Sequence, residues 1–162
     1  MKATLRFVLG SLGVICTSFM AGNATALDVA ICSEPAGYSN FHYSGLVKKG
    51  DSGFTKNKIP GGTNTLKRQE DGTFDILYSD VLNINRSVRN DGAIVEKLRH
   101  GVMDATFLVY YSNNTIELYT FYKDTEGFSR FDLLQSKGGE ALMHSSSVFS
   151  GICSELYLSL MQ

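Results

Sequence analysis

The chain has 162 residues, with 15 basic and 16 acidic side chains and a formal net charge of −1 at pH 7. This balance gives no general electrostatic attraction to nucleic acid or to anionic lipid, so the charge excludes both as default partners. The length fits a single domain that can bury a real hydrophobic core.

The first 26 residues are predicted to be a cleavable secretory signal peptide. Lys2 and Arg6 are the only charges before Asp28, and an apolar run follows from residue 7 to residue 15. The tripeptide at 24–26 reads Ala-Thr-Ala, which is the small-residue pattern that signal peptidase accepts. We therefore expect cleavage after this tripeptide and a mature domain over 27–162, periplasmic or secreted. It keeps all 16 acidic residues and loses two of the 15 basic ones, which gives a net charge of −3.

Two other uses of this segment are less favoured. A permanent membrane anchor needs about 20 predominantly apolar residues, and this run is shorter and interrupted by Gly, Ser and Thr. Acylation at Cys16 would make a lipoprotein, but Ile15 is too bulky for the small position that precedes such a cysteine. No stable membrane insertion is therefore expected after cleavage.

Cysteine usage predicts one disulfide. Removal of the signal peptide takes Cys16 away and leaves Cys32 and Cys153, an even pair in an oxidising compartment. Their bond would join the first strand to the last across a loop of about 120 residues. A reactive or metal-binding thiol pair is the alternative, but there is no Cys-x-x-Cys spacing and no histidine nearby in sequence. We expect no metal and no cofactor.

Turn signals recur about every ten residues along the mature chain, a spacing typical of strands joined by hairpins. They are Gly61-Gly62, Asp71-Gly72, Asp91-Gly92, Gly101, Asn113-Asn114, Glu126-Gly127 and Gly138-Gly139. The clearest hairpin runs from Thr63 to Ser79 around Asp71-Gly72, and its second strand alternates apolar and polar residues with period two.

A second meander is predicted from Ala93 through Gln135. Its strand at 115–123 carries bulky side chains on both faces and should therefore be central, between strands at 105–111 and 128–135. A last strand at 147–153 returns to the disulfide. The segment 80–89 fits a short helix or a strand equally well, and the tail 154–160 stays open.

These patterns predict an all-β fold, a meander of about eight antiparallel strands that closes into a small barrel or pairs into a sandwich. Eight Tyr and ten Phe, with no Trp, supply its aromatic surface. Tyr38, Phe41, His42 and Tyr43 are the candidate ligand-binding residues, because tyrosine joins an apolar body to a polar tip and suits an amphipathic ligand or a protein partner. The competing interpretation is that these aromatic residues fill the core and the sheet surface.

No catalytic residue is assigned. His42, His100 and His144 show no metal-ligand spacing, and His100 is expected to be exposed at a turn. His144 precedes three serines, but no G-x-S-x-G elbow is present, and neighbours on a strand point to opposite faces. Carboxylate pairs such as Asp71 and Asp75 can be judged as catalytic pairs only from the distance between them in the folded protein, which the sequence does not give.

The sequence therefore favours an exported non-enzymatic binding or interaction module of the cell envelope or secretome. Inhibition of a partner protein is one role that such a module can have. A small extracytoplasmic hydrolase and a structural envelope protein are the alternatives. Asn85 and Asn113 match the glycosylation pattern, which matters only in a eukaryotic source.

Overall fold

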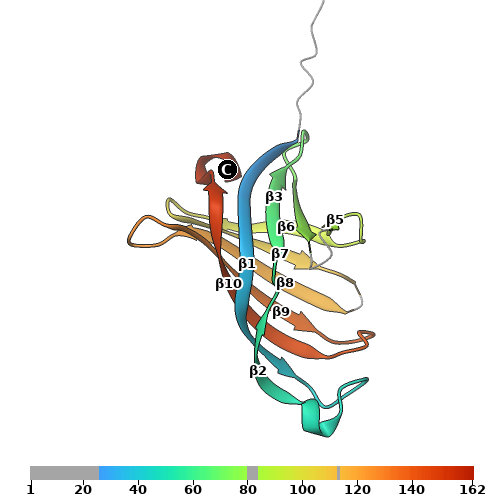
Figure 1. Cartoon of the computed structure of the whole chain (residues 1–162). Helices are drawn as coiled ribbons and strands as arrows, with labels where there is room; N and C mark the ends of the chain where they lie inside the picture. The colour runs from blue at the N-terminus through green and yellow to red at the C-terminus, as the bar shows by residue number, and fades with distance from the viewer. Residues whose placement is uncertain (1–25, 80–83, 113) are drawn as a thin grey trace, which may run out of the picture.

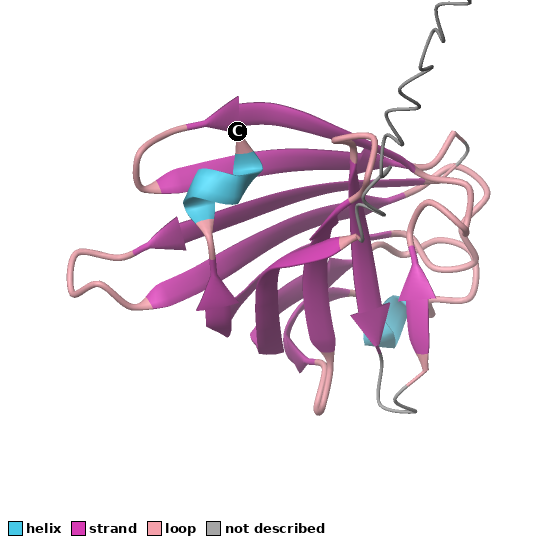
Figure 2. Ribbon diagram, turned by 90° about the horizontal axis from the view of Figure 1, so that it is seen from above, coloured by secondary structure: helices cyan, strands magenta, loops and turns pink. Residues whose placement is uncertain are grey.

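The computed structural model describes residues 26–79, 84–112 and 114–162 (Figure 1). It confirms the all-β prediction, because ten antiparallel strands form one sheet curled into a half-barrel (Figure 2). The predicted signal peptide, apart from Ala26, and the first part of the segment 80–89 lie outside the described residues. No helix in the described ranges is long and apolar enough to cross a membrane.

In chain order the elements are β1 (Leu27–Phe41), η1 (Lys49–Asp51), β2 (Gly53–Lys58), β3 (Thr63–Arg68), β4 (Phe74–Ser79), β5 (Asn85–Ser87), β6 (Ile94–His100), β7 (Asp104–Tyr110), β8 (Thr115–Lys123), β9 (Ser129–Lys137), β10 (Ser145–Leu156) and η2 (Leu158–Met161), where η marks a 3-10 turn. Across the sheet the order is β5-β4-β3-β1-β10-β9-β8-β7-β6, and β2 also pairs with β1. The sequence predicted about eight strands, and β2 and the three-residue β5 bring the number in the described ranges to ten.

The long strand β1 organises the curl of the sheet. Its first half pairs with β3, its second half pairs with β2, and β10 runs along its other side. Between the halves, Glu34 has a φ of 54° and donates its backbone N–H to the Gly62 carbonyl at 2.9 Å, while Pro35 has no N–H to donate. The ladder to β10 shifts register here, and such bulges bend a strand and increase its twist.

The predicted hairpin from Thr63 to Ser79 is confirmed as β3 and β4, with these two residues as cross-strand partners. Its turn uses the Asp-Gly pair as expected. Gly72 has a φ of 81°, a backbone conformation that glycine adopts without strain, and the Asp71 carboxylate accepts bonds from both the backbone and the hydroxyl of Thr73.

The second meander and the disulfide are confirmed as well. Strand β8 lies between β7 and β9, as predicted for the segment 115–123. Strand β10 then returns to β1, where Cys32 and Cys153 are cross-strand partners joined by a disulfide. In the tail after Cys153, residues 154–156 continue β10, and the chain then forms η2.

One end of the half-barrel is filled by a phenylalanine core. The ring centroids of Phe74 and Phe107 are 4.9 Å apart, those of Phe107 and Phe121 are 6.0 Å apart, and those of Phe121 and Phe131 are 6.2 Å apart. All four side chains are buried. This end is therefore dry, and aromatic packing contributes beyond the area it buries.

The turn η2 closes this dry end. Met161 is fully buried, and its carbonyl accepts a hydrogen bond from the Lys97 Nζ at 3.0 Å. The ring Nε2 of His100 lies 2.9 Å from the Leu158 carbonyl, so this histidine is half-buried and holds the C-terminal turn. The prediction of an exposed His100 is wrong, because the chain end folds back over its turn.

Gly151→Ala tests how closely β10 approaches this core. An added Cβ would lie 2.3 Å from a ring carbon of the buried Phe131 and 2.6 Å from the Ser33 carbonyl oxygen. Since neither neighbour can move freely, we expect the free energy of unfolding to fall by about 1–3 kcal/mol in urea titrations. Gly138→Ala meets nothing within 4 Å and should change it by less than about 0.5 kcal/mol. Equal effects of the two substitutions would refute this packing.

Candidate ligand-binding cavity

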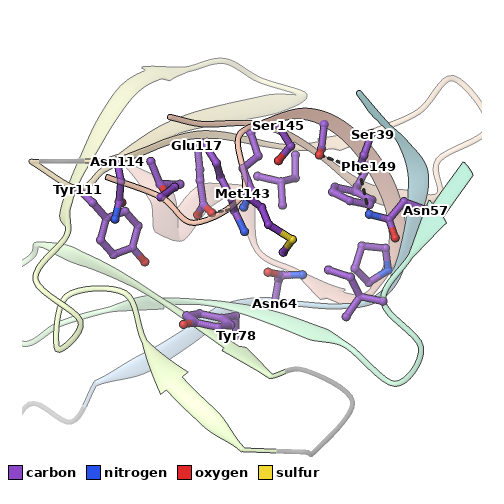
Figure 3. Close-up of a pocket in the computed structure, with 18 of the residues that line it drawn as sticks. Ser39, Asn57, Asn64, Tyr78, Tyr111, Asn114, Glu117, Met143, Ser145 and Phe149 are labelled. Atoms are coloured by element: carbon purple, nitrogen blue, oxygen red, sulfur yellow. Dashed lines mark hydrogen bonds between the residues drawn. The ribbon is translucent and has the colours of Figure 1, made fainter. Parts of the chain in front are cut away.

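The other end of the half-barrel holds a cavity of about 800 Å³ on the concave face of the sheet (Figure 3). One wall is formed by the inner faces of β8, β9, β10 and the second half of β1. The opposite wall comes from β2 to β5. The volume lies within the range that small-molecule sites usually occupy.

The strand registers place inward-facing residues in four rows across β8, β9, β10 and β1. From the mouth inward, the rows are Thr115, Lys137, Ser145 and Phe41; then Glu117, Gln135, Ser147 and Ser39; then Tyr119, Leu133, Phe149 and Gly37; and last Phe121, Phe131 and Gly151. Along these four strands the side chains change from mostly polar in the two rows nearest the mouth, where Phe41 is the exception, to mostly apolar at the floor, where the phenylalanine core begins.

The second row is a hydrogen-bonded polar band. The Glu117 carboxylate accepts one bond from the Gln135 side-chain amide and another from the Tyr119 hydroxyl at 3.0 Å. Further along the band, the hydroxyls of Ser39 and Ser147 lie 2.7 Å apart. Glu117 is only 7% exposed, so these bonds hold an acidic side chain in a fixed position on the concave face of the sheet (Figure 3).

The opposite wall carries a charged pair with a tyrosine. Asp91 accepts bonds at 2.9 Å from the Arg86 guanidinium and from the Tyr78 hydroxyl. Arg86 lowers the pKa of the Asp91 carboxyl, while burial, helped by the bond to Asp91, raises the pKa of Tyr78 to about 12. Burial also raises the pKa of Tyr111, and the charge of Glu117 raises it further. These phenols are therefore neutral at physiological pH.

The raised pKa of Tyr78 predicts an alkaline loss of stability. An unfolded tyrosine loses its proton near pH 10, whereas the folded phenol keeps it until about pH 12, so this stabilisation is complete below pH 10 and is lost as the pH rises through 12. Tyr78→Phe should therefore flatten the fall in the free energy of unfolding between pH 10 and 12. Urea titrations at several pH values measure this fall, and an unchanged slope in Tyr78→Phe would contradict the raised pKa of Tyr78.

Two loops meet at the mouth of the cavity. The backbone N–H of His42 donates to the His144 carbonyl at 2.9 Å, and that of Leu46 donates to the Leu142 carbonyl at 3.1 Å. This contact holds Leu142 and Met143, which are 73% and 53% exposed, at the edge of the cavity. The His144 ring Nε2 lies 3.2 Å from the Gly139 carbonyl, within the same loop.

Of the four predicted ligand-binding residues, only Phe41 lines the cavity, where it is half-buried. Tyr38 is 55% exposed on the outer face, beside Val148, because it neighbours the inward-facing Ser39. His42 and Tyr43 follow the end of β1 and are exposed. The structure does not bring the four side chains together in the cavity, and their ligand-binding role stays a prediction.

Sequence reasoning missed the polar band and the opposite wall. The available signal was the run of polar residues at alternate positions in β8 to β10, such as Glu117, Gln135 and Ser147. Within the described ranges, no group of His, Cys, Asp and Glu is arranged to hold a metal ion.

In comparisons with known proteins, no family model, curated protein or solved structure matches the chain. The geometry of the cavity therefore carries the functional argument alone.

Proposed function

We propose that the mature chain is an exported, non-enzymatic binding protein, periplasmic or secreted, that holds a small amphipathic molecule in the half-barrel cavity. The observation that carries this proposal is the cavity of about 800 Å³ with a fixed polar band above an aromatic floor. Such sites are mostly apolar, and a few placed polar groups orient the ligand.

Preorganisation of the walls supports this function. Asn57 donates to Ser39 at 2.9 Å, and the Thr63 and Ser79 hydroxyls lie 2.7 Å apart, so polar groups on several strands already have partners. A ligand that enters such a site orders few side chains, which reduces the entropic cost of binding. The Cys32–Cys153 disulfide is consistent with an oxidising, extracytoplasmic location.

Ser145→Trp and Ser146→Trp test the location of the site. Ser145 is buried and lines the cavity, whereas Ser146 is exposed on the outer face of the same strand. We expect isothermal titration calorimetry to detect stoichiometric binding of at least one octyl compound among octylammonium, 1-octanol and octanoate. An indole at position 145 fills the space near the mouth and should weaken that binding by on the order of tenfold or more.

The matched control is the indole at position 146, which should leave binding unchanged. Circular dichroism melts confirm that both variants fold. If no octyl compound binds to the unsubstituted chain, or if both variants bind as it does, the cavity is not the ligand site.

A further inference from the structure

We propose that the cavity selects cationic amphiphiles, with an organic ammonium group seated against Glu117 and an apolar tail directed toward the mouth. This inference rests on the proposed binding function and specifies the chemical class of the ligand.

The first support is the state of the Glu117 carboxylate. It is 7% exposed, lines the cavity, and accepts bonds only from the neutral Tyr119 hydroxyl and Gln135 amide among the described residues. None of the four ion pairs in the described ranges includes Glu117. A buried carboxylate without a cation is costly, and a bound ammonium supplies the missing charge.

The second support is the aromatic surround. Tyr78, Tyr111 and Tyr119 line the same cavity, and Figure 3 shows the first two beside the space that Glu117 faces. Burial and the charge of Glu117 raise the pKa of Tyr119 and of Tyr111, so both phenols stay neutral. Neutral tyrosine rings attract ammonium groups through their faces, and the attraction is stronger when water is excluded.

The cationic residues of the cavity do not oppose this selection. Arg86 is paired with Asp91 at 2.9 Å on the opposite wall. Lys137 belongs to the row nearer the mouth, and its ammonium is not within 4 Å of the Glu117 carboxylate. An anionic head group at the polar band would meet the like charge of Glu117 at short range, which disfavours it.

The apolar part of the ligand has its own surface. Phe41 lines the cavity from β1 in the row nearest the mouth, and Leu142 and Met143 line it from the loop between β9 and β10. A tail that extends from the polar band toward the mouth contacts these side chains and loses apolar area to water. Methionine adapts to tails of different shape because its side chain is unbranched and flexible.

The experiment compares three probes that share one octyl tail, octylammonium, 1-octanol and octanoate, by calorimetry at pH 7 with the chain purified after export. We expect octylammonium to bind more tightly than 1-octanol by on the order of tenfold to a hundredfold, because its hydrogen bond to the carboxylate is charge-assisted. Glu117→Gln should reduce octylammonium affinity to that of 1-octanol and leave 1-octanol binding unchanged.

Glu96→Gln is the matched control, since it removes the same charge from an exposed position on β6 and should keep the preference for octylammonium. Wild-type affinity for 1-octanol or octanoate equal to that for octylammonium would overturn the cationic selection and leave the binding function standing. An unchanged octylammonium affinity in Glu117→Gln would also overturn it. Absence of binding by all three probes would overturn the binding function itself. The ranking in the wild type tests the inference even if Glu117→Gln does not fold.

Discussion

Replacing Cys32 and Cys153 together by alanine is expected to lower the free energy of unfolding by about 3–5 kcal/mol. The two cysteines are 121 residues apart in sequence, yet they are paired across the neighbouring strands β1 and β10. In the chain-entropy model, a cross-link that closes a loop of roughly 100 residues lowers the conformational entropy of the unfolded chain. This loss stabilises the folded state by about 4.7 kcal/mol. Loss of the buried sulfur atoms adds a smaller packing cost.

Urea unfolding with and without a thiol reductant measures this effect. Reductant should bring the wild-type transition close to that of the double variant, while the double variant itself should not respond to reductant. A double variant that unfolds within about 1 kcal/mol of the oxidised wild type would show that the pairing of β1 with β10 holds without the cross-link.

The hairpins of this fold could be predicted because their signals are local. The Asp71-Gly72 turn specifies the register of β3 against β4, and period-two alternation marks the strands themselves. Strand β8 was located from the bulk of its side chains on both faces, which is typical of a strand with neighbours on both sides. The disulfide followed from cysteine number and compartment.

The cavity could not be predicted because its residues meet only through long-range pairing. Glu117, Gln135, Ser147 and Ser39 form one row across four strands, and no local pattern gives their relative registers. Because β8 carries bulky side chains on both faces, the sequence does not indicate which face lies on the concave side of the sheet. The same alternation explains why neighbouring aromatic residues after Tyr38 do not form one site.

No local sequence pattern indicates the curl of the sheet either. It depends on β1 changing partners from β3 to β2 at Glu34 and Pro35, and a glutamate with a φ of 54° carries no sequence signal for that conformation. The change of partner leaves β2 and β3 both paired with β1. Asn57 on β2 then bonds Ser39 of the polar band, and Asn64 on β3 faces the band across the cavity.

Phe121→Ala is expected to lower the free energy of unfolding by about 3–5 kcal/mol. Its side chain is fully buried, and its ring lies 6.0 Å from Phe107, 6.2 Å from Phe131 and 6.3 Å from Tyr119 between centroids. The fixed strands around it prevent the space from collapsing, so the loss of transfer energy is increased by the cost of an empty volume.

Phe54→Ala is the matched control, because it removes the same side chain from β2, where it is 83% exposed, and should cost less than about 0.5 kcal/mol. Urea titrations of both variants compare the two ends of the half-barrel. A small cost for Phe121→Ala would mean that the phenylalanine core does not stabilise the sheet. A large cost would show that the buried aromatic residues at one end of the half-barrel supply stability that the open cavity at the other end cannot.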